Sequence, residues 1–479
     1  MPLLWAQAAE AHSFGTLYTL PVPFSMYVWG AAGALLFSFA VIGWIAARQP
    51  ADFDLRIRDV SDSIVVQGLR RLRAPRLSRV ASVGGLVLCI ATGLFGTANP
   101  YLNLNMTLFW ILFVLGFTYL VAAAGDLYSV ANPWRVIVES VRSKRWGFFD
   151  GRVRYPPWLD CWPALAFYMG FIWVELFAFG GPYSLAVILL GYTAINVAGA
   201  WLVGSRDWFL CCEFFGVFLR LIGRMSPVEY LLPESRGEHG RVRLRLPFGG
   251  LLQDRARSLG EVTFILFMLS STAFDGLHVT QVWGRLYWVD VWHALQPWLS
   301  ANIVEAYPTL KPLKLAYDTV ALIASPFVYL AAYLVCSSLA KALTQSQRSS
   351  RELGLCFAYS LVPITLVYNV THYYTLILTQ GVQIVRLASD PFGVGWNLFG
   401  TAGWMLRPAL PAMGAIWHTQ VGLIVLGHIM SVHLAHLEAL RVFPDRRTAM
   451  VSQLPMLLLM VLITTVGLWI LAQPIQSGQ

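Results

Sequence analysis

Long apolar stretches separated by short polar segments recur along almost the whole chain. A helix needs about 20 apolar residues to cross the hydrocarbon core of a bilayer, and ten stretches reach or approach that length. They are residues 25–47, 80–97, 107–124, 162–180, 184–203, 259–277, 318–339, 353–379, 413–437 and 451–471. The pattern predicts an all-α, polytopic transmembrane helix bundle of about ten spans, folded as a single membrane-embedded domain over residues 1–479.

Two segments fit the spanning pattern less well than the others. The sixth stretch is a short apolar run that Glu261 and Asp275 cap at its two ends. Residues 208–222 are apolar but are interrupted by Glu213 and Arg220. We expect this last segment to be an interfacial or re-entrant helix rather than a full span.

The composition supports a membrane protein and excludes an ordinary soluble one. Hydrophobic residues make up 57% of the 479 residues and charged residues only 12%, whereas about 25% of a soluble domain is charged. The mean hydropathy is +0.60. These values are typical of a polytopic membrane protein.

The basic residues are confined to one side of the expected spans. Of the 34 Lys and Arg, 29 lie in the loops 48–79, 125–160 and 205–258 or follow the seventh and ninth stretches. Because cytoplasmic loops carry the excess of Lys and Arg, these loops should be cytoplasmic. The segments 1–24 and 278–315, the latter rich in Trp, and both termini should then face outwards. The net charge of +9 is therefore an insertion signal and does not indicate binding to nucleic acid.

The first eleven residues resemble the end of a signal peptide. They finish with Ala8-Ala9-Glu10-Ala11 but lack a basic segment before them. A signal peptide carries both features, so residues 1–11 are either an uncleaved start or the remnant of a longer leader.

Ionisable side chains gather at the predicted outer ends of several spans. Asp275 and His278 end the sixth, His372 lies near the outer end of the eighth, Asp390 follows it in the next outer loop, and His418 lies near the outer end of the ninth. Two or three His with one carboxylate suit a divalent metal ion that holds an activated hydroxide. We therefore expect metal ligands at His372, His418, Asp275 and His278, and catalytic roles for Asp275, His372 and Asp390. The competing interpretation is helix capping by Asp275 and Asp390 together with hydrogen bonds between helices.

The ninth span carries a stripe of imidazoles. At 100° per residue, His418, His428, His433 and His436 share one side of the helix. This stripe would suit a membrane transporter or a metal-handling subunit with a histidine-lined path, which is the alternative to an enzyme. Glu175 in the fourth span is either a proton relay or a hydrogen-bonded contact between helices.

Several segments together resemble a family of bacterial polytopic membrane proteins labelled fenitrothion hydrolase. The likeness runs in one order over nearly the whole chain. The segments are His12-Ser13-Phe14-Gly15, Leu20-Pro21-Val22-Pro23, Gly125-Asp126-Leu127, Asn132-Pro133-Trp134-Arg135, Glu213-Phe214-Phe215-Gly216-Val217, Arg220-Leu221, Phe274-Asp275-Gly276-Leu277, Ser360-Leu361-Val362-Pro363-Ile364, His372-Tyr373, Asp390-Pro391-Phe392-Gly393 and Asn397-Leu398-Phe399-Gly400.

The resemblance implies hydrolysis of the P–O aryl bond of an organophosphorus triester such as fenitrothion, with release of a nitrophenol. It assigns no catalytic residue. The chain departs from the family pattern at His12-Ser13 and at 16–19, and it has His278 where Ser is usual. The implied partners are an apolar small molecule and the lipid bilayer of the bacterial inner membrane. Whether a second subunit is needed stays open.

Overall fold

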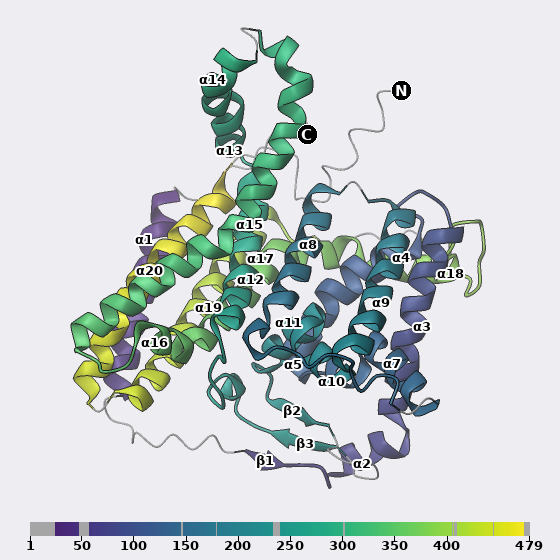
Figure 1. Cartoon of the computed structure of the whole chain (residues 1–479), viewed down its shortest axis with the longest axis horizontal. Helices are drawn as coiled ribbons and strands as arrows, with labels where there is room; N and C mark the ends of the chain where they lie inside the picture. Colours follow the sequence, from purple (N-terminus) through teal and green to yellow (C-terminus); the bar gives the residue numbers. More distant parts are fainter. Residues whose placement is uncertain are drawn as a thin grey trace.

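The computed structural model is an all-α bundle of long, roughly aligned helices (Figure 1). It describes residues 24–46, 57–144, 147–178, 180–232, 240–299, 302–404, 406, 410–443 and 445–473. The expected outer segment 1–24, except its last residue, and the expected leader remnant 1–11 lie outside the described residues. The predicted fold class is confirmed.

Eight helical segments of the described chain are long and apolar enough to cross a membrane. Six are single helices: α1 (Phe24–Ala46), α3 (Ala74–Phe95), α9 (Pro182–Val203), α15 (Ile303–Thr344), α19 (Met413–Val442) and α20 (Arg446–Ala472). The seventh is the continuous run of α4 (Leu104–Met106), η2 (Thr107–Phe117) and α5 (Thr118–Ala124). The eighth is the run of α16 (Ser350–Phe357), η8 (Ala358–Leu361), α17 (Val362–Thr379), η9 (Gly381–Gln383) and α18 (Ile384–Ser389). Each overlaps one of the ten predicted spans, although α15 begins 15 residues before the predicted span 318–339. The chain is therefore a multi-pass membrane protein.

The other two predicted spans are also helical but do not meet the same criteria. Helix α8 (Trp162–Phe177) is shorter than a span, and α12 (Leu259–His278) is not apolar enough. Sixteen of the 20 residues of α12 are buried. It packs against α8, α15, α17 and α20, so its polar side chains contact protein rather than lipid.

The segment predicted to be interfacial or re-entrant is a broken helix inside the bundle. The π-helical turn η4 (Trp208–Cys212), which follows α10 (Ser205–Asp207), ends at Glu213, and α11 (Phe214–Gly223) begins there. Seven of the ten residues of α11 are buried. Between α5 and α8, the chain also forms α6 (Tyr128–Ala131), α7 (Pro133–Lys144) and η3 (Pro157–Leu159).

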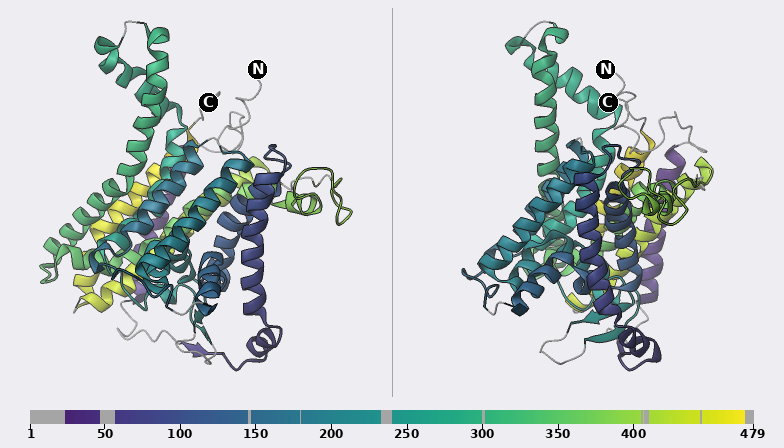
Figure 2. Two further views of the ribbon diagram at one scale, coloured as in Figure 1. Left: turned by 45° about the vertical axis from the view of Figure 1, so that its right-hand side comes forward. Right: turned by 90° about the vertical axis from the view of Figure 1, so that its right-hand side faces the viewer.

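A small sheet covers one end of the bundle. Its antiparallel strands lie in the order β1 (Arg58–Asp59), β3 (Arg241–Leu244) and β2 (Val228–Leu231), with Leu244 opposite both Arg58 and Val228. Helix α2 (Ile64–Arg71) lies beside it, and η5 (Gly249–Leu251) follows β3. Figure 2 shows the sheet and α2 below the helices. They come from the loops that are rich in Lys and Arg.

A helical hairpin projects from the opposite end (Figures 1 and 2). It consists of α13 (Gln281–Arg285), η6 (Leu286–Val291), α14 (Trp292–Leu295), η7 (Gln296–Trp298) and the first part of α15. A buried Lys314–Asp318 ion pair of 2.5 Å on α15 supports it, and Trp283 donates from its indole to the same Asp318. The predicted Trp-rich segment 278–315 therefore lies at the end of the molecule away from the basic loops.

Candidate functional site

The buried carboxylate of Asp275 lies between two side chains of α17. Its side chain is 2% exposed. The Tyr373 hydroxyl donates a hydrogen bond of 2.6 Å to Oδ2 of Asp275, and Nε2 of His372 lies 2.8 Å from the same oxygen. Burying a carboxylate costs free energy unless polar partners stabilise it. These two contacts provide such partners at the end of α12.

Local helix geometry explains why neighbouring residues reach one carboxylate. His372 and Tyr373 project about 100° apart around α17, and Asp275 lies between those two directions. Gly276 follows Asp275 where α12 approaches α20. A Cβ atom on Gly276 would lie only 2.7 Å from Cγ2 of Ile470. The glycine therefore permits the close helix packing that brings α12 beside α17 and α20.

A small pocket of about 40 Å³ reaches Asp275 and Tyr373. Most of its wall is apolar and aromatic. The residues that line it are Phe113, Val114, Leu115, Thr118, Tyr168, Phe171, Ile172, Glu175, Leu176, Phe214, Phe215, Phe218, Leu219, Ser271, Thr272, Asp275, Asn369 and Tyr373. The carboxyl-bearing residues in this wall are Asp275 and Glu175. A few polar groups in an apolar concavity are typical of a small-molecule site.

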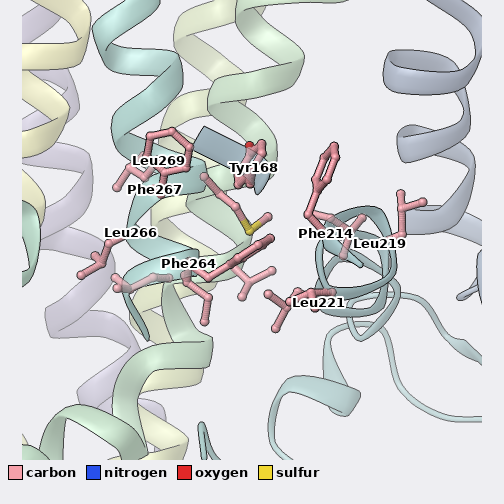
Figure 3. Packing of buried hydrophobic residues seen from close by; sticks show 14 of the residues in the cluster. Tyr168, Phe214, Leu219, Leu221, Phe264, Leu266, Phe267 and Leu269 are labelled. Carbon is pink, nitrogen blue, oxygen red and sulfur yellow. The ribbon is translucent and has the colours of Figure 1, made fainter. Parts of the chain in front are cut away.

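Close aromatic packing builds the wall of the pocket. Tyr168 of α8 stacks on Phe214 of α11 with ring centres 5.7 Å apart, and it contacts Phe264 and Phe267 of α12 at 5.1 and 5.0 Å. Figure 3 shows Tyr168 between these residues. Because a packed interior resists changes of volume, these contacts hold the wall in place.

Glu213 fixes the helix that supplies three of the aromatic wall residues. Its buried carboxylate accepts hydrogen bonds from the backbone N–H groups of Phe215 (3.0 Å) and Gly216 (2.8 Å), which caps α11. It also accepts hydrogen bonds from Tyr192 (2.7 Å) and Asn132 (3.0 Å). Four donors thus stabilise one buried charge and hold α11 against the bundle.

His278 is directed mainly toward its own helix. Its Nδ1 lies 2.8 Å from the carbonyl oxygen of Asp275 and 4.0 Å from the carboxylate Oδ1 of that residue. Its ring stacks on Phe274 with centres 5.6 Å apart. The structure therefore brings His278 close to Asp275, as predicted, but the imidazole interacts with the last carbonyl groups of α12.

The structure does not place Asp390 and His418 in this pocket. Asp390 ends α18 and accepts hydrogen bonds from the backbone N–H groups of Val394 and Gly395, at 3.0 and 2.7 Å. His418 is exposed on α19, where its ring contacts that of Tyr27 of α1 at 6.1 Å. The turn-capping role of Asp390 corresponds to the competing interpretation given above.

The predicted metal-ligand set does not assemble in the described part of the chain. No three His, Cys, Asp or Glu side chains there are grouped so that they could hold a metal ion. Asp275 and His372 alone offer two ligands, whereas zinc sites in proteins use three or four. The residues present therefore do not fit the expected metal centre.

The histidines of α19 make separate contacts rather than a shared site. His428 is fully buried, with Nδ1 2.8 Å from the carbonyl oxygen of Ile424, and His436 is 2.9 Å from the amide nitrogen of Gln453 on α20. The stripe predicted from the sequence thus faces different neighbours along the helix.

The sequence pattern does not identify Tyr373 or Tyr168 as a site residue. Tyr373 is the residue after His372, and this adjacency to a predicted site residue is the signal that the sequence offers for it. Tyr168 had no signal in the sequence, because its role depends on the position of α11.

Comparison of the chain with family models, with curated proteins and with solved structures gives no match.

Proposed function

We propose that this chain is an integral membrane hydrolase that cleaves the P–O aryl bond of apolar organophosphorus triesters such as fenitrothion. The observation that carries the proposal is Asp275, a buried carboxylate held by His372 and Tyr373 at the wall of an aromatic pocket. Buried ionisable groups in a cleft are candidates for acid–base catalysis. The resemblance of the sequence to the fenitrothion hydrolase family supports the choice of substrate.

The pocket suits an uncharged aryl ester. Phe113, Phe171, Phe214, Phe215 and Phe218 offer ring faces and edges to a nitroaryl group, and such contacts favour offset or edge-on packing. The substrate is neutral and apolar, so it concentrates in the bilayer before it binds. Entry from lipid between helices would avoid passage through water.

Asp275 is the proposed general base. It takes a proton from a water molecule as the water oxygen forms a bond to phosphorus, and the P–O aryl bond breaks. The nitrophenolate leaves readily near neutral pH, so a strong general acid is not required. The Tyr373 hydroxyl donates to Oδ2 of Asp275, and Nε2 of His372 lies 2.8 Å from the same oxygen. They act as positioning residues that fix the carboxylate and stabilise its charge.

The proposed setting is the inner membrane of a bacterium. The sheet and the basic loops would face the cytoplasm, and both chain termini and the α13–α15 hairpin would face outwards. Asp275 lies near the end of α12 remote from the sheet, so the reaction would take place in the outer half of the bilayer.

The decisive experiment uses the purified full chain in vesicles with fenitrothion as the substrate. Asp275→Asn keeps the shape of the side chain but removes the base, and it should lower turnover about a hundredfold or more. Asp390→Asn is the matched control, since Asp390 caps an exposed turn. Equal turnover by the two variants, with unchanged folding, would refute the assignment of Asp275. Absence of turnover by the purified native chain would show that a second subunit is required or that the proposed activity is wrong.

The competing proposal is a transporter or metal-handling protein that uses the histidines of α19. It draws support from His428, a fully buried side chain whose Nε2 has no hydrogen-bond partner among the described residues. Uptake of a divalent metal by vesicles that contain the purified chain, lost in His428→Gln, would favour this function. Hydrolysis without uptake would exclude it.

A further inference from the structure

Helix α2 lies next to the first residues of a membrane-spanning helix. Ser63 caps its beginning through a hydrogen bond from the backbone N–H of Val66. Its end is joined to α3 by a sharp turn at Arg73, whose φ of 53° is in the left-handed region. The turn sets α2 at an angle to α3 at the end of the bundle that carries the sheet (Figure 1). Amphipathic helices at such junctions commonly lie in the headgroup layer.

One side of α2 is apolar and uncovered. Ile64, Val65 and Leu72, the residue that ends the helix, are 90%, 71% and 70% exposed, and Leu69 is also exposed. At 100° per residue, these four side chains fall within an arc of about 140°. An exposed apolar surface on a polar cytoplasmic segment marks an interaction site.

The other sides of α2 face protein and water. The Arg70 guanidinium donates a hydrogen bond of 2.7 Å to the carbonyl oxygen of Gly240 beside β3, and Val66, on the same side, is partly buried. Gln67 is exposed on the side opposite to Leu69. The hydrogen bond to Gly240 therefore fixes the rotation of α2, and it directs the apolar arc away from that contact.

Basic side chains and a lipid-facing surface border the arc. Arg71, Arg73 and Arg76 are exposed around the turn. The apolar surface continues onto α3 through Leu77 and Val80, which are also exposed. The arc is thus continuous with the surface that a spanning helix presents to lipid, and the surrounding charges complement an anionic headgroup.

We propose that α2 binds the leaflet on the sheet side of the bundle, with Ile64, Val65, Leu69 and Leu72 among the upper acyl chains. Arg71, Arg73 and Arg76 bind the phosphate groups of anionic phospholipids. The bilayer surface is the occupant of this arc, in preference to another protein, because the exposed apolar residues Leu77 and Val80 of the spanning helix α3 follow it directly after the turn. The inference does not depend on the hydrolase activity.

The test measures the depth of α2 in a bilayer. The partly buried Cys211 and Cys336 are replaced by Ser in the full chain. Val65→Cys is then labelled with a fluorophore, and Gln67→Cys, on the opposite side, is the matched control. Both proteins are placed in vesicles whose phosphatidylcholine is brominated near the glycerol end of its acyl chains. Strong quenching at position 65 and little at 67 is expected. Equal quenching at the two positions, or none at 65, would overturn the proposal and leave the arc to a protein partner.

The contribution of the charges is measured separately. Addition of phosphatidylglycerol to the vesicles should increase quenching at position 65 further. Arg71→Gln combined with Arg76→Gln should remove this increase but retain the quenching seen in phosphatidylcholine alone. These side chains are exposed, so the variant should keep the elution volume and thermal unfolding of the parent. An increase that persists in the variant would refute the role of the arginines.

Discussion

The hydroxyl of Tyr373 donates a 2.6 Å hydrogen bond to the carboxylate of Asp275, a residue 98 positions earlier in the chain. The bond joins α12 to α17 inside the bundle. It also satisfies one of the oxygens of a buried carboxylate. The proposed catalytic function and the packing of two helices therefore share one contact.

Removing this hydroxyl should affect both catalysis and stability. A hydrogen bond to a charged group contributes about 1.5–3 kcal/mol, and about 1.4 kcal/mol of transition-state stabilisation corresponds to a tenfold change in rate. We expect Tyr373→Phe to lower kcat for fenitrothion about tenfold with little change in KM. Tyr374→Phe is the control, since that hydroxyl makes only a 3.4 Å contact with the carbonyl oxygen of Ile416. Equal kcat values for both variants would contradict a positioning role for Tyr373.

Replacing Glu213 should destabilise the pocket wall. In Glu213→Gln, one carboxylate oxygen becomes an NH₂ group that faces hydrogen-bond donors, and each buried unsatisfied group costs about 1–3 kcal/mol. A lower thermal unfolding midpoint is expected. Glu139→Gln is the control, because that carboxylate pairs with Arg79 and Arg135 at a half-exposed site, where ion pairs contribute about 0–1 kcal/mol. A midpoint as high as that of the control would show that Glu213 is not needed to hold α11.

Arg245 should be essential for the fold of the basic end of the molecule. Its guanidinium donates to the carbonyl oxygens of Ser226 and Gly223, at 3.1 Å each, and to Glu229 at 2.9 Å. Burial lowers the pKa of this arginine from its usual value. Breaking such a buried pair costs about 3–5 kcal/mol because the partner loses its counter-charge. We expect Arg245→Met to lower the midpoint of denaturant unfolding strongly. Arg243→Met should change it little, since Arg243 is more exposed and lies 4.0 Å from Glu229.

Asp445 should make the stability of α20 depend on pH. Its carboxylate caps the helix by accepting hydrogen bonds from the backbone and side chain of Thr448, and these bonds lower its pKa below the usual 3.8. A lowered folded-state pKa means that the stabilisation is fully present above pH 3.8 and is lost as the pH falls through the folded-state value. The difference in thermal midpoint between the native chain and Asp445→Ala should therefore shrink below pH 3.8. A difference that is constant from neutral to acidic pH would contradict this.

The bundle could be predicted from the sequence because the side chains that face lipid must be apolar. The two exceptions, α8 and α12, are instructive. Asp275 and Glu261 made the sixth span look weak, yet they are buried in α12 and bonded to Tyr373 and Tyr359. Hydropathy reports the preference of a segment for lipid, so it underestimates a helix that is surrounded by protein.

The candidate site could be predicted only in part. Asp275, His278 and His372 were correctly grouped at one end of the bundle, since each is an ionisable residue at the same end of a span. Asp390 and His418 have the same depth in the sequence pattern, but depth does not specify position around the bundle. That position depends on which helices are neighbours, and the order of spans along the chain does not determine it.

The burial of α12 has a consequence for the biogenesis of this protein. The translocon releases into the membrane the segments that lipid accepts, and α12 carries Glu261 and Asp275, which lipid accepts poorly. Two of the helices that enclose it, α15 and α17, are encoded after it and end at Thr344 and Thr379. We expect α12 to enter the membrane only after the helices that enclose it have been synthesised. Ribosomes stalled before residue 379 would then carry a chain in which α12 is not yet integrated.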